Sequence, residues 1–166
     1  MRWRHVSRVN PIARDVADRH YNRQSVGAQD FCPPGRCTVL LCEHPDGNAL
    51  WVTSWPFAEY VQHAWAGAWV NSCFRNEGPH LSSELILEAV AATCHVWTPP
   101  SDLGLITFVD ASKVNSRNPG YCYQKAGFTK VGFTKGGLLA YQLLPEEMPP
   151  PLPATGMTYN LFGDDA

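Results

Sequence analysis

Two stretches of the sequence hold most of the side chains that could bind an anion or move a proton. The first, residues 75–83, has the sequence R-N-E-G-P-H-L-S-S and contains Arg75, Gly78, Ser82 and Ser83. It lies between a predicted strand and a predicted helix, where unpaired backbone N–H groups and the helix dipole favour an anion. This stretch could hold a pyrophosphate, and a plain strand-to-helix connection capped by Ser82 explains the same residues.

The second stretch starts at Asp110, the last residue of a predicted buried strand, and continues into a short helix that carries Tyr121 and Tyr123. The carboxyl ends of parallel strands often lie at ligand sites in α/β proteins. A carboxylate there can accept a proton from a nucleophile, and a tyrosine can give a proton to a leaving group. The alternative is that Asp110 caps a turn and Tyr123 packs on the sheet.

His20 and Tyr21 form a third candidate, at the end of the first predicted helix. His20 could act as a base near neutral pH, and a histidine stabilised by the helix dipole is the simpler alternative. With His80 and Asp110 it could bind a metal ion if the three side chains converge. Whether a metal is needed stays open, since the C-x4-C-x4-C-x-H spacing of residues 32–44 is not a usual zinc pattern.

Hydrophobic alternation and turn signals define the elements that must position these side chains. Asn10 and Pro11 begin a helix over residues 10–21, and Ser82 is expected to cap the helix that follows 75–81. Within 69–74, every second side chain is expected to face the same side of the sheet. Strands are predicted over 37–43, 49–55, 69–74, 103–110, 128–134 and 138–144, and further helices over 82–97 and 116–127.

This order of elements predicts an α/β (α+β) fold with a mixed, mostly antiparallel sheet and flanking helices. The crossover through helix 82–97 makes 69–74 and 103–110 a parallel pair inside an otherwise antiparallel sheet. With 166 residues the chain is expected to form one domain over 1–145, followed by a Pro-rich tail over 146–166. No apolar run reaches the length of a membrane span, so a cytoplasmic protein that contacts no membrane is expected.

Charge and aromatic residues bear on possible partners. The formal net charge is −2, but residues 1–36 hold seven arginines against three aspartates. Such a basic arm could face a polyanion such as DNA, and a solvated helix face accounts for it equally well. The stretch 51–69 offers many aromatic faces, Trp55 among them, for a flipped base, for core packing or for a homodimer contact.

Two motifs resemble the GNAT (GCN5-related N-acetyltransferase) superfamily. R-N-E-G-P-H at 75–80 resembles its Q/R-x-x-G-x-G/A loop, and Y-Q-K-A-G-F at 123–128 is similar to its Y-x-K-x-G-F helix ending. The resemblance implies transfer from acetyl-CoA or a related acyl donor to an amine. The loop residues Arg75, Gly78, His80, Ser82 and Ser83 would hold the donor, and Tyr123 would protonate its thiolate. Two residues depart from the pattern. His80 stands where the family has a small Gly or Ala, and Pro79 removes a backbone N–H group that could bind the pyrophosphate.

A narrower resemblance covers R-N-E-G-P-H-L-S-S-E-L-I and TFVDASKVNSRNPGYCYQKAGF. These segments resemble Mom-type phage proteins, a divergent branch of the superfamily that converts the N6 amine of adenine in DNA to a carbamoylmethyl form. The resemblance implies a phage-encoded enzyme of the host cytoplasm that acts on double-stranded DNA. On the matched positions, Arg75, Ser82, Ser83, Asp110 and Tyr123 would line the site, and we expect Arg75, Ser83, Asp110 and Tyr123 to be catalytic. From the residues themselves, we expect His20, Tyr21, Trp55 and Tyr121 to bind the substrate.

Three functions remain open on these observations. The first expectation is modification of adenine N6 in DNA. The second is a conventional acetyl-CoA-dependent N-acetyltransferase that acts on a small-molecule or protein amine. The third is a DNA-binding protein that has kept the fold without catalysis, in which the arginine arm and the Pro-rich tail would make the contacts.

Overall fold

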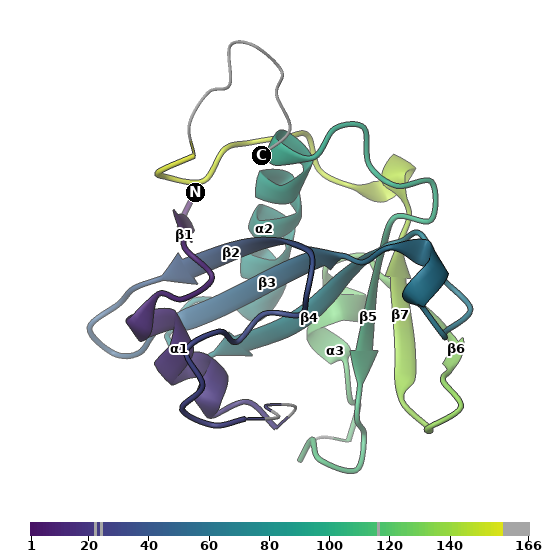
Figure 1. Ribbon diagram of the computed structural model, residues 1–166, viewed down its shortest axis with the longest axis horizontal. Coiled ribbons are helices and arrows are strands. Elements are labelled where there is room, and N and C mark those ends of the chain that lie inside the picture. Colours follow the sequence, from purple (N-terminus) through teal and green to yellow (C-terminus); the bar gives the residue numbers. More distant parts are fainter. Residues whose placement is uncertain (22, 24, 116, 158–166) are drawn as a thin grey trace.

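A single seven-stranded sheet forms the centre of the computed structural model, which describes residues 1–21, 23, 25–115 and 117–157. Its strand order is β1-β2-β3-β4-β5-β7-β6 (Figure 1). The strands are β1 (Arg4–Val6), β2 (Arg36–Cys42), β3 (Ala49–Trp55), β4 (Trp69–Asn76), β5 (Leu105–Val109), β6 (Thr129–Phe133) and β7 (Leu139–Leu143). The helices are α1 (Pro11–Asp18), α2 (Ser82–Val96) and α3 (Tyr121–Lys125), with 3-10 turns at Ala58–Tyr60 and Pro145–Glu147.

The predicted fold class is confirmed. Strands β4 and β5 run parallel and the other neighbouring strands run antiparallel. One core joins α2 and α3 to one face of the sheet, and a second core joins α1 to the other face over β2, β3 and β4. None of the helices in the described ranges is both long and apolar enough to cross a bilayer.

Local signals explain why α1 begins where it does. The Asn10 side chain accepts hydrogen bonds from the backbone N–H groups of Ile12 and Ala13, both at 3.0 Å, and Pro11 occupies the first helical turn. These contacts confirm the predicted cap. One side of the helix, with Ala13 and Val16, is fully buried against the sheet.

Helix α2 confirms its predicted apolar stripe and corrects its predicted cap. Leu85, Ile86 and Ala89 on the stripe are completely buried. Leu81 rather than Ser82 is the N-cap residue, and no side chain caps the helix there. The prediction was wrong because the Ser82 hydroxyl accepts a hydrogen bond from the Asn76 amide at 3.0 Å, across the preceding loop.

Strand β4 contains a bulge that overturns the predicted alternation. Thr53 pairs with Asn71 and the preceding Val52 pairs with Cys73, so Ser72 is an extra residue on β4. A bulge reverses which face the following side chains reach. Cys73 therefore joins the core under α1, although Trp69 lies in the core under α2.

Beyond the bulge, β4 and β5 separate. Their register runs only from Trp69 opposite Leu105 to Asn71 opposite Thr107. After that point β4 remains paired with β3 as far as Asn76, and β5 remains paired with β7 as far as Val109. The two strands consequently diverge at their carboxyl ends, which opens the sheet between them.

The first and last described parts of the chain meet at one sheet edge. Strand β1, which the sequence pattern did not predict, pairs with β2 and forms a parallel bridge from Arg4 to Thr155. Residues 145–157 run over α2 and reach that edge (Figure 1), and the Leu152 N–H donates to the Ala91 carbonyl at 3.1 Å. The part of the predicted tail up to residue 157 thus packs on the domain, and residues 158–166 lie outside the described residues.

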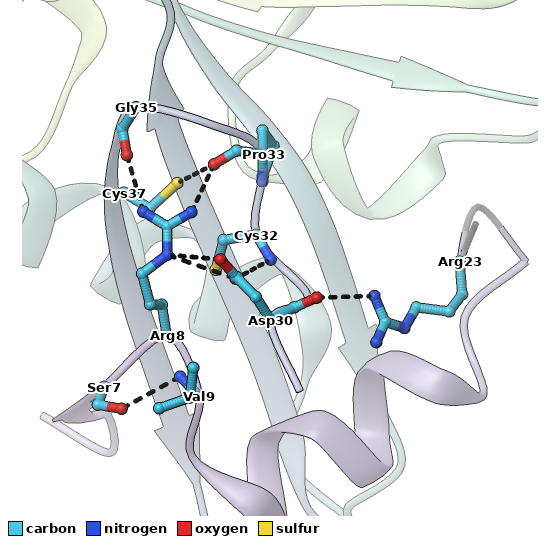
Figure 2. Close-up of polar contacts among 9 residues, drawn as sticks. All are labelled: Ser7, Arg8, Val9, Arg23, Asp30, Cys32, Pro33, Gly35 and Cys37. Atoms are coloured by element: carbon cyan, nitrogen blue, oxygen red, sulfur yellow. Dashed lines mark hydrogen bonds and ion pairs between the residues drawn. The ribbon is translucent and has the colours of Figure 1, made fainter. Parts of the chain in front are cut away.

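Most of the N-terminal arginines hold neighbouring segments together. Figure 2 shows the Arg8 guanidinium against Asp30 and the carbonyl groups of Pro33 and Gly35, which it reaches at 2.7 and 2.9 Å. Other arginines of the basic arm pair with carboxylates: Arg2 with Glu84 and Glu88, Arg4 with Glu43, Arg19 with Glu77, and Arg23 with Asp18. Much of the positive charge of the arm is therefore balanced within the fold.

Gly104, at the start of β5, supports the parallel pairing, because its carbonyl accepts a hydrogen bond from the Trp69 N–H at 2.9 Å. Its φ is +68°, and a Cβ added there would overlap the Leu143 carbonyl oxygen.

Gly137 has a φ of +85° with open space around it. We expect Gly137→Ala to lower the free energy of unfolding by about 1–2 kcal/mol, the cost of left-handed backbone. Gly104→Ala should cost about 3 kcal/mol or more.

Urea denaturation of both variants measures the difference. Equal losses for the two substitutions would mean that the contact between Gly104 and Leu143 does not constrain the sheet.

Candidate functional site

A cavity of about 380 Å³ occupies the gap where β4 and β5 diverge. Residues from β4, β5, the end of α1, the start of α2 and α3 line it. Five of the predicted site residues come together here: His20, Tyr21, Arg75, Ser82 and Tyr123. This volume lies within the range typical of small-molecule sites.

Tyr123 is the most deeply placed of these residues, with an exposed fraction of 8%. Its ring packs between Phe128 and Tyr141, with centroid distances of 5.5 and 6.2 Å. Burial raises the pKa of its hydroxyl well above the usual value, so the group keeps its proton at neutral pH. The raised pKa makes this hydroxyl a weaker acid than an exposed tyrosine, so what it offers at the cavity wall is a fixed position.

Asn71 holds that hydroxyl in place. The Asn71 Nδ2 donates to the Tyr123 hydroxyl at 3.0 Å and to Thr107 Oγ1 at 3.3 Å. The amide lines the cavity and is 6% exposed, and its Oδ1 has no hydrogen-bond partner among the described residues. A buried acceptor without a partner costs roughly 1–3 kcal/mol. Since less than 1 Å² of this oxygen is accessible, it lies behind the cavity surface.

His20 and Tyr21, in the turn that follows α1, stack at the cavity wall with ring centroids 4.4 Å apart. The Tyr21 hydroxyl accepts a hydrogen bond from the Asp110 N–H at 3.4 Å, which links the end of α1 to the end of β5. Partial burial raises the pKa of Tyr21. The stacked pair offers an aromatic surface to whatever enters the cavity.

The Asp110 carboxylate points to the turn that follows β5. It accepts hydrogen bonds from the Ser112 N–H at 3.0 Å and from the Ser112 hydroxyl at 2.5 Å. The Ser112 hydroxyl lowers the pKa of Asp110, which weakens it as a base. Asp110 is not among the described residues that line the cavity, and its contacts are those of a turn cap.

The loop between β4 and α2 is fixed by Asn76, which the sequence analysis did not single out. Its side chain accepts from the Gly78 N–H at 3.0 Å and donates to the His80 carbonyl at 2.7 Å. A Cβ on Gly78 would lie 2.5 Å from the Gly47 carbonyl oxygen, so the glycine is required by contact with the β2–β3 turn. Gly78, His80 and Ser83 are not among the described cavity-lining residues.

Arg75 is tied to a carboxylate beside the cavity. Its Nε donates a hydrogen bond to Glu77 at 2.8 Å. Arg19 donates two hydrogen bonds to the same carboxylate, at 2.6 and 2.8 Å. The Arg19 hydrogen bond, with help from Arg75, lowers the pKa of Glu77 to about 2. A carboxylate held by two arginines thus lies within the loop that the sequence analysis expected to bind pyrophosphate.

The remaining predicted contacts lie apart from the cavity lining. Trp55 packs edge-to-face on Trp69 and lies under the Arg36 guanidinium, 5.5 Å from its ring centroid. Tyr121 is 54% exposed on α3 and lies near Lys125. His80 contacts His44 edge-on, and the described residues contain no group of three or more potential metal ligands.

Compared with known proteins, the chain matches no protein-family model, no curated protein and no solved structure. The functional conclusions therefore depend on the geometry described above and on the motifs of the sequence.

The Glu77 ion pairs predict a pH-dependent contribution to stability. Because the pKa of Glu77 falls from 4.5 to about 2 on folding, its contribution is complete above pH 4.5 and is lost as the pH falls toward 2. We expect Glu77→Gln to lower the free energy of unfolding at pH 7, and the deficit relative to wild type to shrink across that acidic window.

Urea denaturation at several pH values measures this difference. Glu147→Gln is the matched control, since Glu147 is exposed and has no ion pair among the described residues. A deficit for Glu77→Gln that stays constant from pH 7 to pH 2 would contradict the assignment.

Proposed function

We propose that this protein transfers a carbon group to the exocyclic N6 amine of adenine in DNA, as a phage-type DNA modification enzyme related to the GNAT superfamily. The observation that carries the proposal is the cavity between the diverging β4 and β5, with the buried Tyr123 hydroxyl in its wall. This arrangement supports a reaction in which two reactants approach through the opening of the sheet.

The aromatic pair at the cavity supports a nucleobase as acceptor. Enzymes that modify a base within a duplex flip it out of the stack and hold it against aromatic side chains. His20 and Tyr21 form such a stacked surface, and Lys113 from the loop after β5 adds a positive charge at the lining. A phosphate next to the flipped nucleotide would be attracted by that charge.

The proposed reaction needs a proton donor and a proton acceptor. The amine nitrogen attacks the electrophilic carbon of the donor, the new N–C bond forms, and the bond to the leaving group breaks. The Tyr123 hydroxyl, which is held in position by Asn71 at the cavity wall, gives its proton to the leaving group as negative charge develops there. His20 accepts the proton that the amine loses.

The loop does not fit a pyrophosphate of acetyl-CoA in the way the motif implies. The Gly78 N–H is bonded to Asn76, the Glu77 N–H is bonded to the Asn48 carbonyl, and Pro79 has no N–H. The Arg75 guanidinium, which the motif would use for the anion, is already paired with the Glu77 carboxylate. We therefore assign no step to coenzyme A, although Ser82 and Ser83 at the first turn of α2 leave their N–H groups available.

The N–H groups in the first turn of α2 could bind an anionic donor, so they support the second candidate, a conventional N-acetyltransferase that uses acetyl-CoA or a related acyl donor. The bulge at Ser72, beside the same cavity, also supports it, since bulges often re-aim groups next to active sites. Micromolar binding of acetyl-CoA, measured by calorimetry, would favour this candidate.

Mass spectrometry of nucleosides from plasmid DNA, recovered from bacteria that express the protein, tests the first candidate. We expect an added mass on deoxyadenosine. Tyr123→Phe should reduce that product by about 10²–10⁴-fold, because it removes the proton donor and preserves the ring. Tyr141→Phe is the matched control: Tyr141 stacks on Tyr123, but its hydroxyl donates to the Pro119 carbonyl and is not part of the described lining.

The outcomes separate the three functions. Unmodified DNA together with acetyl-CoA binding would move the assignment to the conventional acetyltransferase. Unmodified DNA together with tight DNA binding and no acetyl-CoA binding would leave the non-catalytic DNA-binding protein. Equal losses for Tyr123→Phe and Tyr141→Phe would remove Tyr123 from the mechanism.

A further inference from the structure

We propose that Cys32 and Cys37 form a redox-active pair, in which a peroxide oxidises Cys37 and Cys32 then closes a disulfide that a thiol reductant reopens. The inference goes beyond the proposed transfer and does not depend on it. It starts from the place of the two thiols in the fold. Both are free cysteines, both are partly exposed, and both pack at the margin of the core that α1 shares with the sheet.

A tight bend brings the two cysteines together. Cys37 is the second residue of β2, and the bend through Pro33, Pro34 and Gly35 connects it to Cys32. Gly35 has a φ of +100°, a conformation that favours glycine. In its protonated form the Cys37 thiol donates a hydrogen bond to the Pro33 carbonyl at 3.5 Å, so it faces the residue next to Cys32.

Arg8 fixes this bend and brings a positive charge to it (Figure 2). Its guanidinium donates to the carbonyl groups of Pro33 and Gly35 at 2.7 and 2.9 Å. It also pairs with the Asp30 carboxylate at 3.1 Å, which in turn accepts from the Cys32 N–H at 2.9 Å. The backbone around both cysteines is therefore held by one arginine, and a positive charge beside a thiol favours its thiolate form.

The two thiols differ in how readily they ionise. Hydrogen bonding from the Cys32 thiol lowers the pKa of Cys37, and the Arg8 charge acts in the same direction against the effect of burial. The same interaction, together with burial, raises the pKa of Cys32, so this thiol keeps its proton. Because the thiolate is the nucleophilic form, Cys37 is the residue that reacts first and Cys32 is the one that resolves the product.

The chemistry takes two steps with hydrogen peroxide as oxidant. The Cys37 thiolate attacks one peroxide oxygen, the O–O bond breaks, and the departing hydroxide takes up a proton to become water, which leaves Cys37 as a sulfenic acid. The Cys32 sulfur then attacks Cys37 Sγ, the S–S bond forms, and the hydroxyl leaves as water with the Cys32 proton. The two thiols lose two electrons and the peroxide gains them.

The test is peptide mapping of the full chain, first reduced and then treated with one equivalent of hydrogen peroxide at pH 7. An acid quench and alkylation under denaturing conditions block the remaining thiols. Trypsin cuts after Arg36, so a disulfide between Cys32 and Cys37 joins two peptides that otherwise separate, and fragmentation distinguishes Cys37 from Cys42. We expect this disulfide as the main product, and we expect dithiothreitol to reverse it.

Two variants test the order of the steps. In Cys32→Ser the sulfenic acid at Cys37 has no resolving thiol, so dimedone should label it. In Cys37→Ser we expect labelling of Cys32 to be at least about tenfold slower, because its thiol stays protonated. Cys122→Ser is the matched control, since Cys122 is also partly exposed and burial raises its pKa. It should leave the disulfide unchanged.

The wild-type map decides the inference even if a variant fails to fold. Recovery of Cys32 and Cys37 as alkylated thiols would overturn it, and so would oxidation of Cys37 to sulfinic acid without a disulfide. Peroxide labelling of Cys32 in Cys37→Ser as fast as that of Cys37 in Cys32→Ser would overturn the assigned order. The Cys32–Cys37 disulfide, formed by the wild type and by Cys122→Ser, would support the pair whatever the plasmid DNA shows.

Discussion

After Asn71 and Thr107 the strands β4 and β5 no longer share hydrogen bonds, because each remains paired with its outer neighbour. The opening that results is bounded on one side by α1 and on the other by α2 and α3. Every cavity residue discussed above, from His20 to Tyr123, borders this opening. If β4 and β5 were paired by hydrogen bonds along their whole length, the sheet would be continuous there and would leave no space between these side chains.

Much of this architecture could be predicted from the sequence, since helix caps, alternation and turn residues are local signals. The strands from residue 36 onward and the face of α2 belong to that category. Strand β1 could not be predicted, because R-H-V is short and polar and becomes a strand only through partners at β2 and Thr155. The bulge at Ser72 likewise depends on its register with β3, which no local pattern contains.

The candidate site shows the same division. Tyr123 and Arg75 could be singled out because motifs surround them, and the topology then brings them to one cavity. In the sequence Asn71 looked like an ordinary strand residue. Its part in the site is visible only from its buried amide, in which Nδ2 bonds the Tyr123 hydroxyl and Oδ1 has no partner among the described residues. Glu77 could not be anticipated as the partner of Arg19, since 58 residues separate them in sequence. Residue types alone therefore overstated the free positive charge at the loop.

The contact between β1 and Thr155 also bears on how the protein is made. The His5 N–H donates to the Thr155 carbonyl at 2.8 Å, and the Thr155 N–H donates to the Trp3 carbonyl at 3.1 Å. While the chain is being synthesised, the outer edge of β1 stays uncovered until residue 155 has left the ribosome. An uncovered edge strand is a template for pairing with other chains. The outer edge of β1 thus depends on a segment that lies far later in the sequence to cover it.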